Sequence, residues 1–448
     1  MNTIASLHNH FNDGSDSAAA LVKRQIARVT DPAGEGARAF LSLDQSAVKR
    51  AAEVSQRRLA SGNARPLEGI TISIKDLFDV EGEVTGAGST VLRTRPAATE
   101  DCPAVARLRD AGAIMFGRNN MVEFAYSGVG INPHFGTPRN VWGRTAAGGG
   151  RVPGGSSSGG GVAVADGMTV AALGSDTGGS VRLPAALNGV CGFKPTAVRI
   201  PVVGAIALSV THDSVGPIAP TVACCARIDA VLAGEPYSLG PVRSLKGVRL
   251  LKPNALIWRE LDHEVEASVN AAVEKLRFQG AEIVEAPLAL LDELFERPGV
   301  IAAEALDWHK ANINVEGVGY DPRVWLRMQA GRDVTRGEYS AALAYRRLWI
   351  DRMNIALGGF DAVICPTVAC IAPEIAPLIA DDALFFKTNA RILRNTAWVN
   401  FMDGCALTMP CQPPGGAPVG LQLIGQHGRD HDILALGLDC EAVLQLAN

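Results

Sequence analysis

Two glycine-rich clusters that carry serine lie close together in this chain. They read GGSSSG over residues 154–159 and DTGGS over residues 176–180, and an alanine-rich apolar segment joins them. Glycine lets the backbone turn sharply and brings bare N–H groups against a ligand. A serine after a Gly-Gly pair can therefore sit among unshielded donors, which is what an acyl-transfer nucleophile with an oxyanion hole requires. For either cluster alone, a tight turn with an incidental serine is the simpler interpretation.

A serine hydroxyl needs a base before it can attack, and the chain offers histidine or lysine. Of the eight histidines, His212 beside Asp213 and Ser214 is the best placed, although a loop residue in contact with backbone is the more ordinary interpretation. Lys75 ends a strand-like apolar run that begins at Ile70. Burial lowers the pKa of a lysine, so a buried Lys75 could act as a neutral base. A lysine that reaches to solvent at the strand end is equally consistent with the run.

In combination these residues resemble the amidase signature family of serine hydrolases. The order Lys75, then GGSSSG, then GSDTGGSVRLP over residues 174–184 matches the family pattern closely. The likeness covers residues 65–220 strongly and the rest of the chain diffusely. Further family-like segments lie at residues 112–114, 119–125, 192–196, 213–217, 361–367 and 419–425.

The resemblance implies a Ser-cisSer-Lys triad. Ser180 would be the nucleophile, Ser156 the bridging serine after a cis Gly155–Ser156 peptide, and Lys75 the base. The oxyanion would be bound by the backbone N–H groups of four consecutive residues, Thr177, Gly178, Gly179 and Ser180.

The resemblance also implies which residues surround the triad. Ser157, Asp176 and Arg182 would hold the serine turns in place, although a surface ion pair is the alternative for the last two. The acyl pocket would be lined from four segments, at residues 124–135, 206–211, 308–325 and 368–371. One departure is the segment 140–153, which is about five residues longer than the family pattern and represents either loop drift or a reshaped entrance.

The expected activity is hydrolysis of a carbon–nitrogen bond in a small, non-peptide, primary amide, giving a carboxylate and ammonia. The alternative is a glutaminase, the A-type subunit of an amidotransferase, which would pass ammonia within a multi-subunit complex. A non-catalytic relative is a third class, but Lys75, Ser156 and Ser180 are all present. The substrate itself is not encoded in any recognisable cluster of charge.

Other motif classes fit the chain poorly. No phosphate-binding G-x-x-x-x-G-K-[ST] motif is present, and no G-x-G-x-x-G follows a strand. Residues 46–49 read SAVK and match the S-x-x-K of penicillin-binding proteins, but neither S-D-N nor K-T-G accompanies them. No cofactor and no metal site is expected.

Composition narrows the partners. The 448 residues carry a formal net charge of −4, which provides no basic face for nucleic acid or an anionic membrane. Nine scattered cysteines without C-x-x-C spacing favour a reducing compartment, and no secretory signal is visible at the N-terminus. We therefore expect a cytoplasmic enzyme with a small-molecule amide as its partner, and allow for a homodimer.

The elements that must position the triad alternate between helix and strand. Helices are predicted over 16–29, 44–61, 102–111, 120–125 and 160–166, with strands over 69–76, 113–117 and 169–173, and a long helical region spans 287–356. Together with the resemblance this predicts an α/β fold, a single large mixed β-sheet covered by helices on both faces. We expect one domain over residues 1–448: N-terminal helices at 1–64, a catalytic core at about 65–220, and residues 221–448 completing the sheet and pocket.

Overall fold

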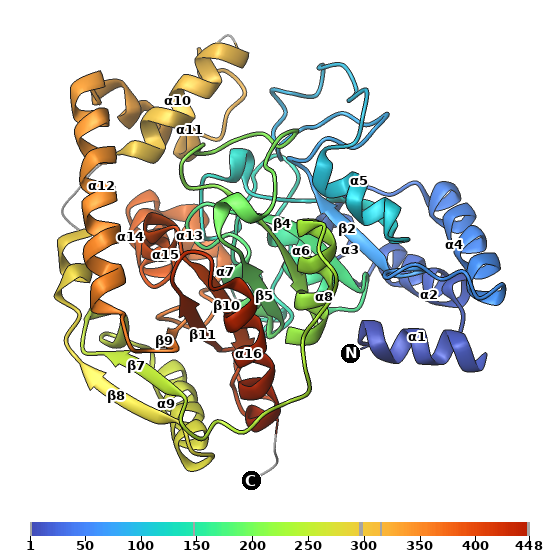
Figure 1. Ribbon diagram of the computed structural model, residues 1–448. Coiled ribbons are helices and arrows are strands. Elements are labelled where there is room, and N and C mark those ends of the chain that lie inside the picture. Colours follow the sequence, from blue (N-terminus) through green and yellow to red (C-terminus); the bar gives the residue numbers. More distant parts are fainter. Residues whose placement is uncertain (1, 147, 295–298, 314–315, 446–448) are drawn as a thin grey trace.

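The computed structural model describes residues 2–146, 148–294, 299–313 and 316–445. Within these ranges the chain builds one mixed sheet of eleven strands in the order β1-β3-β2-β4-β6-β5-β10-β11-β9-β7-β8 (Figure 1). The strands are β1 (Phe40–Ser42), β2 (Thr71–Lys75), β3 (Ile114–Asn119), β4 (Ala171–Asp176), β5 (Cys191–Lys194), β6 (Ser214–Ala219), β7 (Arg249–Pro253), β8 (Glu282–Ala286), β9 (Ala362–Pro366), β10 (Cys405–Pro410) and β11 (Gly420–Gly425). The α/β prediction is confirmed.

Helices surround this sheet (Figure 1). They are α1 (Ile4–Asp13), α2 (Ala18–Thr30), α3 (Gly36–Ala39), α4 (Gln45–Ala60), α5 (Pro103–Asp110), α6 (Ser158–Ala165), α7 (Arg182–Asn188), α8 (Val222–Ala233), α9 (His263–Phe278), α10 (Val300–Asn312), α11 (Pro322–Gln329), α12 (Arg336–Ala356), α13 (Ile375–Ala380), α14 (Asp382–Leu393), α15 (Ala397–Met402) and α16 (Asp430–Leu444). In the described part of the chain, none of them is long and apolar enough to cross a bilayer.

Strand β4 shows how the helices divide between the two faces. Its Ala172 packs in one apolar cluster with Val164 of α6 and Ala185 of α7. The neighbouring Leu173 belongs to another cluster, which includes Cys440 of α16 as well as residues of α8. Because successive side chains of a strand point to opposite faces, α6 and α7 cover one face of the sheet and α8 and α16 the other.

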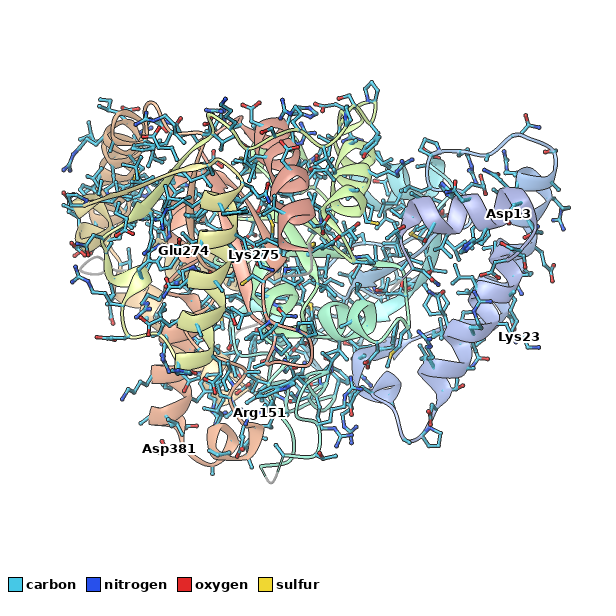
Figure 2. All side chains as sticks on the ribbon, turned by 90° about the horizontal axis from the view of Figure 1, so that it is seen from below. Asp13, Lys23, Arg151, Glu274, Lys275 and Asp381 are labelled. Atoms are coloured by element: carbon cyan, nitrogen blue, oxygen red, sulfur yellow. The ribbon has the colours of Figure 1, made fainter. Side chains whose placement is uncertain are left out.

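All three predicted portions of the chain contribute strands to this sheet. Strand β1 comes from residues 1–64, strands β2 to β6 from 65–220, and strands β7 to β11 from 221–448. Figure 2 shows the N-terminal helices, which carry Asp13 and Lys23, at one end of the molecule, and helix α9 with Glu274 and Lys275 toward the other. The site therefore draws on elements that are far apart in sequence.

Local sequence explains most of the elements near the site. All five residues of β2 are buried, as expected for a strand whose apolar run has no polar alternation. Two predictions were wrong. Residues 120–125 form only a short 3-10 turn at Glu123–Ala125, in which Phe124 has φ +48°. The region 287–356 is not one long helix, because 3-10 turns and loops separate α10, α11 and α12 in the described residues.

Candidate active site

The register of the sheet brings the lysine to the serines. Strands β2 and β4 are parallel neighbours, with Ile72 opposite Ala171 and Ile74 opposite Leu173. Their carboxyl ends therefore meet at one edge of the sheet, where Lys75 is the last residue of β2 and the turn that holds Ser180 follows β4. Ser156 lies just before α6, which packs against β4.

Lys75 makes direct contact with the predicted bridging serine. Its Nζ donates hydrogen bonds to Ser156 Oγ at 2.7 Å and to Ser175 Oγ at 2.9 Å, and lies 3.3 Å from the Ser175 carbonyl oxygen. Lys75 is 1% exposed and Ser156 is fully buried. The alternative of a lysine that reaches to solvent is wrong.

Burial controls the charge of this lysine. The loss of hydration lowers the pKa of Lys75 to about 7, although the negative charges of Asp176 and Asp213 act in the opposite direction. Close to neutral pH a large fraction of the amine is therefore unprotonated. A neutral amine at 2.7 Å from a hydroxyl oxygen can accept that hydroxyl's proton.

The two serine turns lie against each other. The Gly155–Ser156 peptide is cis, as the resemblance implied. The Ser157 N–H donates to the Ser180 carbonyl oxygen at 3.3 Å, and the Ser156 carbonyl oxygen accepts from Val122 N–H at 3.1 Å. Ser157 thus supports the turn through its backbone, and its Oγ has no hydrogen-bond partner within the described residues.

Asp176 and Arg182 form a buried ion pair that holds the Ser180 turn. Both side chains are fully buried, and Arg182 binds the carboxylate in a bidentate way, with Nη2 at 2.9 Å and Nε at 3.0 Å. Burial opposes ionisation of Asp176, but the Arg182 guanidinium outweighs it and holds the pKa of this carboxyl well below its usual range. The carboxylate also accepts from the N–H groups of Gly179 (2.8 Å) and Val181 (3.1 Å). The alternative of a surface ion pair is wrong.

The turn at residues 177–180 leaves no room for a side chain at its third position. Gly179 has φ +132°, and a Cβ there would lie 2.2 Å from Thr396 Oγ1. Thr396 in turn donates its hydroxyl to the Gly178 carbonyl oxygen at 2.6 Å. Of the four predicted oxyanion donors, Gly179 directs its N–H at Asp176, so in this structure it holds the turn.

Several residues that support the site were not anticipated from the sequence. Arg182 donates to Gln422 of β11 and to Asn400 of α15, each at 2.7 Å. Asp213 accepts from the Thr177 hydroxyl, and burial raises the pKa of Asp213 to about 6. Gln422 and Asp213 lie in segments that resemble the family pattern, but Asn400 carries no such signal.

His212 does not join the serines. Its Nδ1 lies 3.0 Å from Ser209 Oγ and 2.8 Å from Thr211 Oγ1, and its carbonyl oxygen accepts from Asn400. Burial lowers the pKa of His212 to about 3, so it is neutral in the working pH range. The interpretation as a buried loop histidine is the one that fits these contacts.

The predicted pocket segments come together in pairs. Phe124 stacks on Tyr320 at 5.4 Å between ring centroids and meets His309 edge-on at 4.3 Å. Val129 and Val368 share an apolar cluster. Residues 314–315 of the third segment lie outside the described residues. The acyl pocket itself stays a prediction.

The longer segment 140–153 is fixed at its carboxyl end. Arg151 stacks on Trp142 and donates to the Ala372 carbonyl oxygen at 2.7 Å. The Val152 N–H donates to the Pro373 carbonyl oxygen at 2.8 Å. The extra length thus rests against the loop that precedes α13, and residue 147 lies outside the described residues.

Metal ligands are not clustered in the described ranges. No group of three or more His, Cys, Asp or Glu side chains is arranged to hold an ion there. All nine cysteines are free thiols, and eight of them are buried.

Comparison with known proteins identifies the family. The family model for Amidase matches residues 21–434, so the chain belongs to the amidase family, whose members carry the amidase signature. A crystal structure of an amidase superposes with a TM-score of 0.87 at 31% identity, over 98% of this chain and 99% of that one. The chain is accordingly an amide hydrolase by class.

Two named relatives are similar over most of their length. The chain is 35% identical to 2-amino-5-chloromuconic acid deaminase of Comamonas testosteroni, over 91% of this chain and 88% of the relative. It is 32% identical to the A-type subunit of the glutamyl-tRNA(Gln) amidotransferase of Roseiflexus castenholzii, over 97% of this chain and 94% of the relative.

The buried ion pair predicts a large loss of stability in Asp176→Asn. Removal of one charge leaves Arg182 buried without its counter-ion, which costs about 3–5 kcal/mol in the free energy of unfolding. Urea denaturation would measure this. The matched control is Glu274→Gln, which breaks the exposed pair of Glu274 with Arg277 and should change stability by less than about 0.5 kcal/mol. Equal, small effects of the two substitutions would contradict the assignment.

Proposed function

We propose that the protein hydrolyses a small primary amide through an acyl-enzyme on Ser180, with Ser156 as the bridging serine and Lys75 as the base. The observation that carries the proposal is the 2.7 Å contact between Lys75 Nζ and Ser156 Oγ inside a buried site. The lowered pKa of Lys75 supports its role as a neutral base.

The first half-reaction moves two protons and forms one bond. The neutral Lys75 amine takes the proton of Ser156 while Ser156 takes the proton of Ser180. The Ser180 oxygen then attacks the carbonyl carbon of the amide. The resulting oxyanion is bound by the backbone N–H groups of Thr177, Gly178 and Ser180, while Gly179 is held by Asp176. Loss of one such donor typically costs about 2.7–4 kcal/mol of transition-state stabilisation.

The second half-reaction reverses the relay. Protonated Lys75 returns its proton through Ser156 to the leaving nitrogen, so that ammonia departs and Ser180 carries the acyl group. Water then loses a proton to the same relay as its oxygen attacks the acyl carbon. The products are a carboxylate and ammonia, and the free Ser180 hydroxyl is restored.

The rival is a glutaminase that serves an amidotransferase, since one relative bears that name. The same triad would serve both reactions. The two functions separate when ammonia release is measured with this protein alone, for a panel of primary amides and for glutamine. Turnover of simple amides without any other protein is the expected result. Activity on glutamine alone, and only after a partner subunit is added, would favour the rival.

Substitution of the triad should abolish amide turnover without unfolding the protein. We expect Ser180→Ala and Lys75→Ala to lower kcat by roughly 10⁴-fold or more, and Ser156→Ala to be strongly impaired, because the three groups act as a unit. Ammonia release would report activity and circular dichroism the fold. The control is Ser73→Ala, a buried serine on the same strand whose hydroxyl makes one long contact of 3.5 Å. A Ser180→Ala enzyme with near-normal turnover would sink the proposal.

The charge of Lys75 should set the acid limb of the pH profile. Because the base must be neutral, kcat/KM should rise with pH through about 7 and fall away below it. Ionised Asp213 raises the pKa of Lys75, so Asp213→Asn should lower that pKa and move the limb to lower pH by up to about one unit. A limb that stays in place, or moves to higher pH, is the contrary result.

A further inference from the structure

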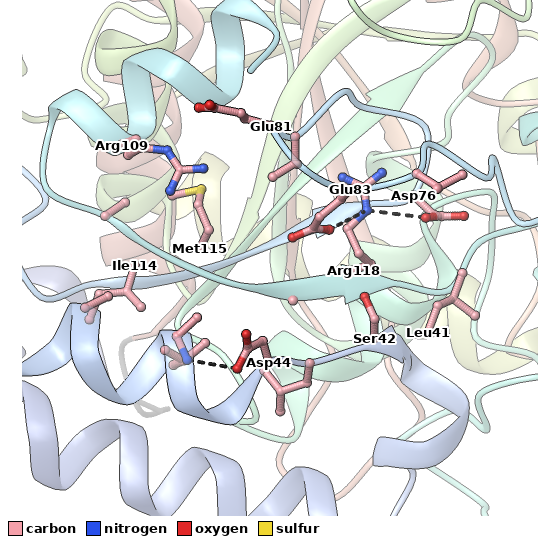
Figure 3. A pocket seen from close by; sticks show the side chains of 18 of the residues that line it. Leu41, Ser42, Asp44, Asp76, Glu81, Glu83, Arg109, Ile114, Met115 and Arg118 are labelled. Carbon is pink, nitrogen blue, oxygen red and sulfur yellow. Dashed lines mark hydrogen bonds and ion pairs between the residues drawn. The ribbon is translucent and has the colours of Figure 1, made fainter. Parts of the chain in front are cut away.

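A second cavity opens on the protein away from the triad. It has a volume of about 1010 Å³ and lies between strand β3, the start of α4 and the segment 80–93 (Figure 3). Neither Lys75 nor Ser156 nor Ser180 lines it. The triad therefore leaves this cavity without a function.

Arg118 of β3 supplies the cavity with buried hydrogen-bond donors that have no acceptor. The residue is 3% exposed, and Figure 3 shows its side chain between Glu83 and Asp76. Only Nε meets these carboxylates, at 3.3 Å from Asp76 Oδ1 and 3.6 Å from Glu83 Oε2. Nη1 and Nη2 have no hydrogen-bond partner among the described residues. Buried donors without an acceptor are costly, so a ligand that pairs with them gains binding free energy.

Most other charged groups around the cavity are already engaged. Arg65 pairs with Glu68, and Arg109 pairs with Asp101. Asp44 caps α4 by accepting from two backbone N–H groups.

Two charged residues on the rim remain open to a ligand. The exposed Arg93 lies over the Phe135 ring at 4.4 Å and has no ion pair with any described residue. Glu81 is exposed on the rim as well. Arg93 thus adds a second positive charge, toward which an anion can enter.

We propose that this cavity binds a small organic carboxylate. The carboxylate oxygens accept from Nη1 and Nη2 of Arg118 in the bidentate geometry that a guanidinium favours. The apolar body of the ligand packs on the hydrophobic lining, which includes Leu41, Val84 and Phe135. A singly charged carboxylate fits better than a doubly charged phosphate, because Asp76 and Glu83 lie against the same guanidinium.

Calorimetric titration with benzoate tests the proposal, with benzyl alcohol as the neutral counterpart. Wild-type protein should bind benzoate and not the alcohol. Arg118→Lys, which removes the fork, and Val84→Trp, which fills the cavity from a position that is 37% exposed, should each weaken benzoate at least about tenfold. Arg109→Lys keeps a charge that is already paired and should stay within about twofold.

The contrary outcomes are equally specific. Failure of wild-type protein to bind benzoate overturns the proposal, as does equal binding of the alcohol, since water then suffices for Arg118. Unchanged affinity in Val84→Trp places benzoate elsewhere, including in the active site, and overturns it too. If Arg118→Lys fails to fold, Val84→Trp decides the matter alone, because its substitution lies on the cavity rim.

Discussion

The burial of one lysine is the constraint on which the rest of the site depends. Lys75 Nζ contacts two hydroxyls and one carbonyl oxygen, and none of these partners is a carboxylate. The ammonium form therefore loses hydration without a contact ion pair to replace it, and burial lowers the pKa to about 7. The more distant charges of Asp176 and Asp213 keep the amine from becoming neutral at a much lower pH.

A second buried charge keeps the serine turn fixed. Asp176 cannot lose its charge easily because Arg182 binds it with both carboxylate oxygens engaged. Arg182 is itself anchored by Gln422 and Asn400, which come from the last part of the chain. The turn that carries Ser180 thus depends on residues more than 200 positions away. This explains why a short core around residues 65–220 needs the C-terminal strands to complete it.

The sequence predicted the parts of the site that have a local signature. The glycine-serine clusters and the apolar run before Lys75 were visible, and the structure brings Lys75 into contact with Ser156. Long-range support was not visible, since Asn400 and Thr396 have ordinary residue types in ordinary helical surroundings. The predicted helix at 120–125 failed because positive φ at Phe124 and Ala125 breaks it, which no periodicity encodes. The Arg118 cavity was equally hidden, because it forms between β3 and the distant α4.

The most direct test of the account is the pKa of Lys75 itself. Carbon-13 labelling of lysine side chains would allow NMR titration of each amine, with the Lys75 signal assigned by its loss in Lys75→Met. Lys194 must be assigned separately, since burial lowers its pKa to about 8. The account predicts a Lys75 titration near pH 7. A Lys75 amine that titrates near the ordinary value of 10.5 would contradict it, because the relay would then lack a base at neutral pH.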